Sequence, residues 1–499
     1  MDLLGNLLIG FREAISLANL GYCFVGVLVG TLIGVLPGIG PLATIAMLLP
    51  LTYNLGPVGA LIMLAGIYYG AQYGGSTTAI LVNLPGETSS VVTCIDGYQM
   101  ARQGRAGPAL AIAAIGSFFA GTVGTLMIAL FGPPLADFAL KFGAPEYFSL
   151  MLMGLVAAAV LAEGDMVRSL AMVGMGLLLG IVGSDVNTGV PRFSFGITQL
   201  TDGIEFVVVA VGVFAVGEII NNLGQTEERE VFTNAIKSLM PTKDDLRASV
   251  GPILRGTGLG AFFGVLPGTG PAVASLSSYM LEKKIATDPS RFGRGAIEGV
   301  AGPESANNAD AQCKFIPMLT LGLPASGVMA LMLGALTIHG IQPGPEVMGT
   351  RPELFWGLVA SMWIGNLMLV ILNLPLVGLW VKILKVPYRL MFPAIMAFSA
   401  IGIYSVNNSA LDIYLAALFA AAGFLWVKLG FNPAPLLLGF VLGPKLEEYL
   451  RRAMLMSEGD VTVFVRHPLS LFFLAITALI LCALVVPALR KRRDEVASS

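Results

Sequence analysis

The residues best suited to chemistry lie in two octets of the form Gly-Val-Leu-Pro-Gly-X-Gly-Pro, at residues 34–41 and 264–271. In each octet, a proline without a backbone N–H and two glycines that tolerate positive φ interrupt a helix. The last proline suits the first turn of a new helix, whose free N–H groups attract an anion without any arginine. The octets therefore predict two backbone anion sites, at Pro37, Gly38, Gly40, Pro267, Gly268 and Gly270.

Each octet is followed by a second break, Asn-Leu-Pro-Gly-Glu at residues 83–87 and Gly-Leu-Pro-Ala-Ser at residues 322–326. Before the first of these, residues 68–78 carry three tyrosines, a glutamine and three hydroxyl side chains but no charge. Buried polar groups need partners, and in a bilayer they usually face a cavity. We expect the substrate site to include Tyr73, Gly74, Gly75, Ser76, Thr77, Pro85, Gly86, Asn308, Pro324 and Ser326.

The matching segment of the second half, residues 302–314, is rich in polar and charged side chains. Asp310 and Lys314 lie four residues apart, so we expect them to pair on one helix face. Neutral oxygens near the breaks suit a weakly held sodium ion. The predicted ion-coupling residues are Ser76, Thr77, Asn83, Asn307, Asn308, Asp310 and Thr320. If protons are the coupling ion instead, Glu304 and Asp310 are the candidate carriers. The alternative for the hydroxyl residues and the breaks is a purely structural role in helix packing. For Asp310 and Lys314 the alternative is an ion pair at the membrane surface without a functional role.

The elements that position these residues are membrane helices. The chain has 499 residues, of which 56% are hydrophobic and 12% charged, whereas a soluble protein carries about 25% charged residues. The stretch from Ala14 to Gly86 has no charge over 73 residues, enough for roughly three crossings. We expect an all-α polytopic membrane protein with about a dozen transmembrane segments, several of them broken or re-entrant. This excludes a soluble enzyme and a disordered chain.

Other sequence features exclude several classes of function. The net charge of −2 gives no indication of a nucleic-acid partner. Four scattered cysteines and two histidines fit neither a disulfide framework nor a zinc site. No hydrolytic, redox or nucleotide-binding motif is present, so we expect no enzymatic activity and no cofactor. If the protein moves a solute, an ion gradient of sodium or protons must drive it.

The octets lie 230 residues apart and indicate an internal repeat. Basic residues fall in the loops at 97–107 and 282–294 but are scarce at 52–57 and 340–353. Since cytoplasmic loops are enriched in Lys and Arg, this reciprocal pattern predicts two inverted repeats. The predicted boundaries are a first repeat at residues 1–223, a polar cytoplasmic connector at 224–255, a second repeat at 256–430 and a C-terminal segment at 431–499.

The chain resembles the large membrane subunit of tripartite tricarboxylate transporters. The resemblance covers about residues 15–490 and is carried by both octets and by the segments 68–87, 306–326 and 443–460. It implies a bacterial inner-membrane carrier of inverted repeats, embedded in the lipid bilayer. Its implied partners are a small four-span membrane subunit and a periplasmic solute-binding protein that delivers a small organic carboxylate. Uptake in this family is driven by a sodium or proton gradient.

Three other functions compete with this interpretation. A membrane enzyme for lipid substrates needs clustered carboxylates or histidines, and the uncharged runs contain none. A passive channel is disfavoured, because two similar breaks favour alternating access. A carrier that works alone, without partner subunits, stays open.

Overall fold

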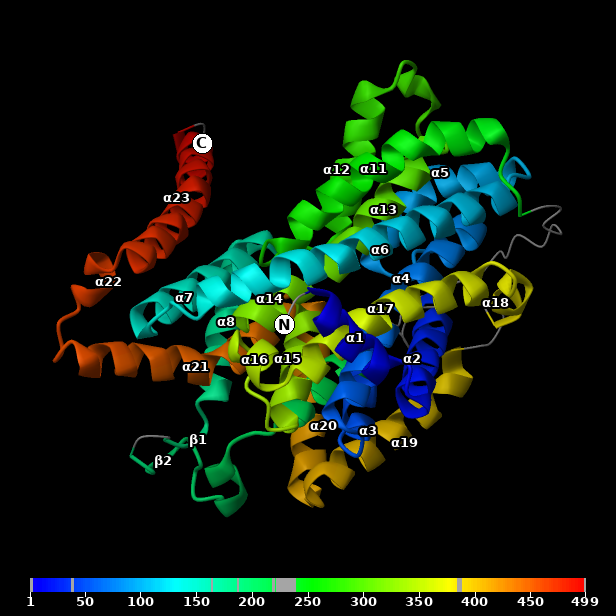
Figure 1. The fold of residues 1–499 in the computed structure, drawn as a ribbon. Coiled ribbons are helices and arrows are strands. Elements are labelled where there is room, and N and C mark those ends of the chain that lie inside the picture. Colours follow the sequence, from blue (N-terminus) through cyan, green and yellow to red (C-terminus); the bar gives the residue numbers. More distant parts are fainter. Residues whose placement is uncertain are drawn as a thin grey trace. The chain divides into compact units, whose positions relative to one another are not determined.

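The computed structural model of the chain describes residues 3–36, 40–162, 165–185, 188–217, 220, 239–383 and 388–497. Within these residues, five helices are long and apolar enough to cross a membrane. They are α2 (Leu17–Val35), α6 (Ala106–Ala139), α7 (Ala144–Leu161), α17 (Pro352–Asn373) and α20 (Ala410–Lys428). The expectation of an all-α membrane protein is confirmed in this outline (Figure 1). The figure of about a dozen spans stays a prediction.

The chain folds into two compact units. The first comprises Met1–Asp137 and Glu205–Lys428, and the second comprises Phe138–Ile204 and Leu429–Ser499. All predicted site residues within the described part belong to the first unit. The boundaries proposed for the repeats stay a prediction, and residues 224–238 of the expected connector lie outside the described residues.

Helices build almost all of the first unit. Its remaining elements are α1 (Leu3–Ala14), α3 (Pro41–Thr52), α4 (Pro57–Val82), η1 (Thr88–Ser90), α5 (Val91–Arg102), α9 (Phe206–Ala210), η3 (Val211–Val216), α11 (Lys243–Val265), α12 (Pro271–Ile285), η4 (Pro289–Arg291), α13 (Glu298–Cys313), α14 (Phe315–Leu321), α15 (Gly327–Ile338), α16 (Glu346–Thr350), α18 (Val377–Ile383) and α19 (Tyr388–Asn407). Because α11 begins at Lys243, the last part of the expected polar connector is helical.

Two helix pairs of the first unit, α2 with α4 and α11 with α13, share one kind of seam (Figure 1). A glycine occurs every fourth residue on the first helix of each pair, so that backbone lies against backbone. A Cβ atom added at these glycines would lie 2.1–2.6 Å from a carbonyl oxygen of the partner helix. The contacts are Gly26–Met63, Gly30–Ile67 and Gly34–Ala71 in one pair, and Gly256–Gly302, Gly260–Ala306 and Gly264–Asp310 in the other.

The helices stop and restart where the sequence predicts. Helices α3 and α12 begin with Pro41 and Pro271 in the first turn, directly after the N-cap glycines of the two octets. The C-cap residues that follow α4 and α14, Asn83 and Gly322, both adopt the left-handed conformation, with φ of 57° and 68°. The four predicted breaks are therefore confirmed as interruptions of helices.

The second unit holds a small departure from the all-α expectation. Strands β1 (Gly183–Ser184) and β2 (Pro191–Arg192) form an antiparallel pair. Asp185 forms ion pairs with Arg192 and Arg451, and both arginines also form ion pairs with Glu447 on α21. The remaining elements are α8 (Met166–Gly180), η2 (Thr198–Asp202), α21 (Ala434–Met456), α22 (Val463–Arg466) and α23 (Pro468–Ala497).

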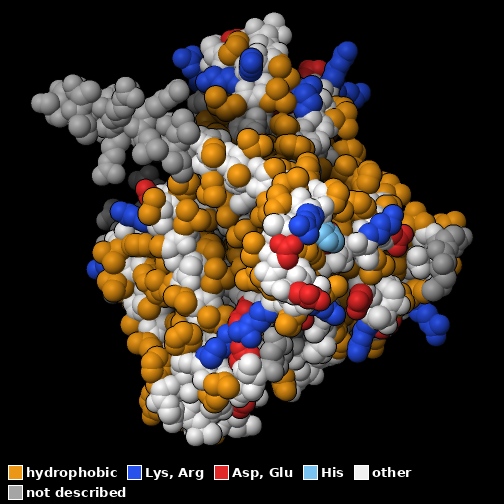
Figure 2. Space-filling view, turned by 90° about the vertical axis from the view of Figure 1, so that its left-hand side faces the viewer, with side chains coloured by type: hydrophobic (Ala, Val, Ile, Leu, Met, Phe, Trp, Pro, Cys, Tyr) orange, Lys and Arg blue, Asp and Glu red, His pale blue; other side chains and the backbone are white. Residues whose placement is uncertain are grey.

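The surface fits a lipid environment. Figure 2 shows hydrophobic side chains over much of one face, with Lys and Arg side chains gathered in separate groups. Large apolar side chains of single helices are widely exposed, among them Leu126 and Phe131 on α6 and Leu418 and Leu425 on α20. Such helices need an apolar surrounding, as a multi-pass membrane protein has.

Candidate functional site

Glu304 on α13 is the centre of a buried polar cluster in the first unit. Its side chain is 1% exposed. It accepts a hydrogen bond of 2.5 Å from Ser76 Oγ on α4, and a second one from the Thr93 hydroxyl on α5. No ion pair between described residues includes Glu304. This carboxylate thus joins three helices through hydroxyl groups alone.

A second carboxylate, Glu87, lies at the second break of the first half. It caps η1 and accepts hydrogen bonds from the Ser89 hydroxyl and, at 3.4 Å, from Asn307 Nδ2 on α13. A Cβ atom added at Gly75 would lie 3.0 Å from Glu87 Cγ, so the glycine leaves room for this side chain. The predicted residues Gly75 and Asn307 therefore meet at Glu87.

Asp310 and Lys314 form a fully buried ion pair on α13, as their spacing predicts. Glu87 lies within electrostatic range of both, and of Glu304. The region therefore contains three acidic side chains and a single basic one. The Oδ1 atoms of Asn307 and Asp310 have no hydrogen-bond partner. Buried charge is costly unless it is compensated, so this region attracts protons or cations.

This cluster forms outside the uncharged runs of the sequence. The uncharged runs indeed hold no carboxylates, but residues that flank them converge from η1 and α13. Among the described residues, no three acidic, histidine or cysteine side chains are close enough to hold a metal ion. The arrangement therefore offers no multinuclear or tightly chelated metal centre within that part of the chain.

The two breaks of each half lie against each other. In the second half the Gly268 N–H donates to the Ala325 carbonyl at 2.9 Å, and Gly268 adopts a φ of 81°. In the first half, a Cβ atom added at Gly86 would lie 2.0 Å from the Gly34 carbonyl oxygen. Pro37 and Gly38 lie outside the described residues. The N-cap residues of α3 and α12 are Gly40 and Gly270, so neither helix has a side-chain cap at its N-terminus.

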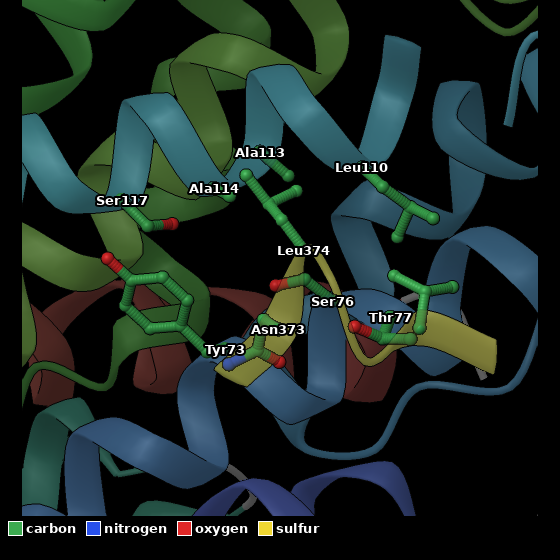
Figure 3. A pocket seen from close by; sticks show the side chains of 10 residues that line it. Tyr73, Ser76, Thr77, Leu110, Ala113, Ala114, Ser117, Asn373 and Leu374 are labelled. Atoms are coloured by element: carbon green, nitrogen blue, oxygen red, sulfur yellow. The ribbon is translucent and has the colours of Figure 1, made fainter. Parts of the chain in front are cut away.

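A small cavity of about 20 Å³ adjoins Ser76 (Figure 3). Its apolar lining comes from Leu110, Ala113, Ala114, Leu374 and Val377. Its oxygen-bearing lining comes from Tyr73, Ser76, Thr77, Ser117 and Asn373. Three of these five were predicted as site residues. The predicted site residue Asn308 contacts one of the lining residues of the cavity, because Asn308 Nδ2 donates to Ser117 Oγ at 2.7 Å.

Other predicted residues stay apart from the cluster. The Thr320 hydroxyl donates to the Ile316 carbonyl of its own helix, and Asn83 is exposed. Ser326 caps α15 by accepting the Met329 N–H. Gly74 serves packing, since an added Cβ atom would lie 2.3 Å from the Thr31 carbonyl oxygen.

Sequence reasoning missed several residues of the site. Glu87 was part of a noted motif but not of the expected site. No local signal pointed to Thr93, Ser117 or Asn373, because their partners are remote in sequence. The one usable signal was Glu304, a carboxylate in the polar segment at residues 302–314, which leads into an apolar run.

Comparison with known proteins identifies the family of the chain. The family model described as the tripartite tricarboxylate transporter TctA family matches residues 20–438. An uncharacterized 52.8 kDa protein from the TAR-I ttuC′ 3′ region of Agrobacterium vitis is 59% identical over 496 residues, covering 99% of both chains. An uncharacterized protein from the TAR-II ttuC′ 3′ region of the same organism is 56% identical over 237 residues, 48% of this chain and 98% of its own length. No solved structure matches the chain. The chain belongs to the tripartite tricarboxylate transporter TctA family, and so is a component of a tricarboxylate transport system.

Proposed function

We propose that this chain is the large, translocating subunit of a binding-protein-dependent secondary transporter that takes up a tricarboxylate-like organic acid across the bacterial inner membrane. Membership of the family supports this role. The proposed partners are a small four-span membrane subunit and a periplasmic solute-binding protein. The observation that carries the proposal is the buried polar cluster around Glu304. It includes Glu87 of the break at residues 83–87, and the backbone of its Asp310 lies against Gly264, the first residue of the second octet.

The substrate carboxylates are proposed to bind at the N-termini of α3 and α12. Both helices begin after an octet with a glycine N-cap and no side-chain cap. Pro41 and Pro271 have no N–H, and the Val273 N–H donates to the Gly270 carbonyl at 3.0 Å. The N–H groups of Leu42 and Ala43 in α3 and of Ala272 in α12 are the ones proposed to bind the anion, and the helix dipole favours negative charge there. Gly268, with its φ of 81°, keeps the backbone open to such a ligand.

Alternating access by two inverted repeats is the proposed mechanism. The matched glycine seams of α2–α4 and α11–α13 support it, because the same contacts recur at an offset of 230 residues in the first helix. So does the left-handed residue that ends both α4 and α14. Transporters built from such repeats commonly bind substrate where broken helices meet.

Ion coupling is proposed because three acidic side chains face a single basic one in this region. Glu304→Gln keeps an acceptor for Ser76 but removes the charge, so we expect uptake to fall at least about tenfold. Thr125→Val is a matched control, since the buried Thr125 hydroxyl bonds only its own helix, at the Gly121 carbonyl.

Uptake of a panel of labelled organic acids tests the proposal. The chain is co-expressed with the binding protein and small subunit encoded beside it, and each partner is then omitted in turn. We expect uptake only with all three proteins and only with an ion gradient. Uptake that survives loss of the binding protein would establish a stand-alone carrier, and equilibration without a gradient would establish a channel.

A further inference from the structure

The small cavity beside Ser76 has the composition of a cation site. It lies between α4, α6 and the end of α17 (Figure 3). Its volume of about 20 Å³ has room for about one water molecule or one unhydrated ion. Hydroxyl and amide oxygens line it, and no basic residue does.

Asn373 supplies an unused acceptor to this cavity. Its side chain is 5% exposed, and its Nδ2 donates to the Leu369 carbonyl at 2.9 Å. Its Oδ1 has no hydrogen-bond partner. A buried acceptor without a partner is costly, so this oxygen needs a donor or a cation. Asn373 is also the last residue of α17, where the helix dipole presents its negative end.

Ser76 connects the cavity to a negative charge. Its hydroxyl has two acceptors within reach, Glu304 at 2.5 Å and the Gln72 carbonyl at 3.1 Å. Because its single proton serves either bond, its oxygen lone pairs are left for the cavity. Glu304 itself has no basic partner among the described ion pairs. A cation next to Ser76 would therefore compensate the buried carboxylate through one intervening hydroxyl.

We propose that this cavity binds one dehydrated sodium ion, held by oxygens of Ser76, Thr77, Ser117 and Asn373. Neutral oxygens with one carboxylate behind them suit a hard monovalent cation. The ion is the coupling ion of the carrier, and in that respect the inference rests on the proposed function. It adds α17 to the coupling machinery, and Thr320 and Asn83 have no part in it.

The test measures sodium binding without substrate and without partner subunits. Thermal unfolding of the purified chain in detergent is followed against sodium, potassium and choline chloride at constant ionic strength. A ligand that binds the folded state raises the unfolding midpoint in a saturable way. We expect sodium alone to do so.

Variants locate the ion. Thr77→Val and Asn373→Leu each remove one oxygen at similar size, and we expect the half-saturating sodium concentration to rise about tenfold or more. Thr125→Val removes a buried hydroxyl elsewhere on α6 and serves as the control. Asn373→Asp keeps the oxygen and adds charge, so it should bind sodium at least as tightly as the natural protein, and it covers the case in which Asn373→Leu does not fold.

Two results would overturn the inference. Equal stabilisation by all three salts would mean that the cavity holds only water. Sodium-specific stabilisation that all the cavity variants retain would place the ion elsewhere. Because binding is measured without transport, a protein that binds sodium here but carries no organic acid would refute the proposed function and leave this site standing.

Discussion

Breaking the buried ion pair of α13 should destabilise the protein strongly. Lys314 and Asp310 are both 0% exposed, so removal of either partner leaves an uncompensated charge out of contact with water. Such a loss costs about 3–5 kcal/mol of unfolding free energy. Lys314→Met should cost more than Asp310→Asn, because Lys314 also attracts Glu87 whereas Asp310 repels it.

The double variant separates the charge effect from simple loss of packing. Lys314→Met with Asp310→Asn removes both charges at nearly constant volume, so it should recover most of the loss caused by Lys314→Met alone. Thermal unfolding in detergent, monitored by size-exclusion chromatography, is measured for the natural protein, both single variants and the double variant, which together form a double-mutant cycle. Lys445→Met in the exposed pair with Glu448 is the control and should cost about 1 kcal/mol or less. Additive single effects, with no recovery in the double variant, would refute the argument.

Two further predictions concern the break and the topology. Gly268→Val should abolish uptake while the protein still reaches the membrane, because valine resists the φ of 81°. Gly258→Val is the control, since Gly258 is an exposed residue of α11 with no atom near an added Cβ. Wild-type uptake by both variants would make the octet a packing feature only. Single cysteines replace the exposed residues Asn54 and Thr287 in a cysteine-free background. A membrane-impermeant thiol reagent should label the cysteine at position 54 in intact spheroplasts and the cysteine at position 287 only after lysis. Labelling of both from one side would mean that the repeats are parallel.

Local signals in the sequence were reliable where the structure is decided locally. Pro41 and Pro271 start helices because their fixed φ and missing N–H suit a first turn. The pairing of Asp310 with Lys314 follows from helical spacing alone.

Contacts between distant segments were not accessible in this way. The bond between Ser76 and Glu304 joins residues 228 positions apart and depends on how α4 packs against α13. Asn373 enters the cavity only because α17 ends there. Thr320 carries a hydroxyl close to the second break, as an ion ligand would, yet this hydroxyl donates to a carbonyl of its own helix. The sequence does not show which of the two partners a threonine hydroxyl will have. Strands β1 and β2 are too short to show an alternating hydrophobic and polar pattern in the sequence.

The glycine seams also determine which parts of the first unit can move. Sliding α2 along α4 by one or two residues would press a side chain onto a carbonyl oxygen that now rests against a glycine. The same holds for α11 on α13, so each pair behaves as a rigid body. A conformational cycle must then be absorbed where these helices join their neighbours: between α2 and α3, and at residues 83–87, 266–270 and 322–326. Spin labels placed within one pair should report a constant distance, whereas labels that span a joint should report two distances.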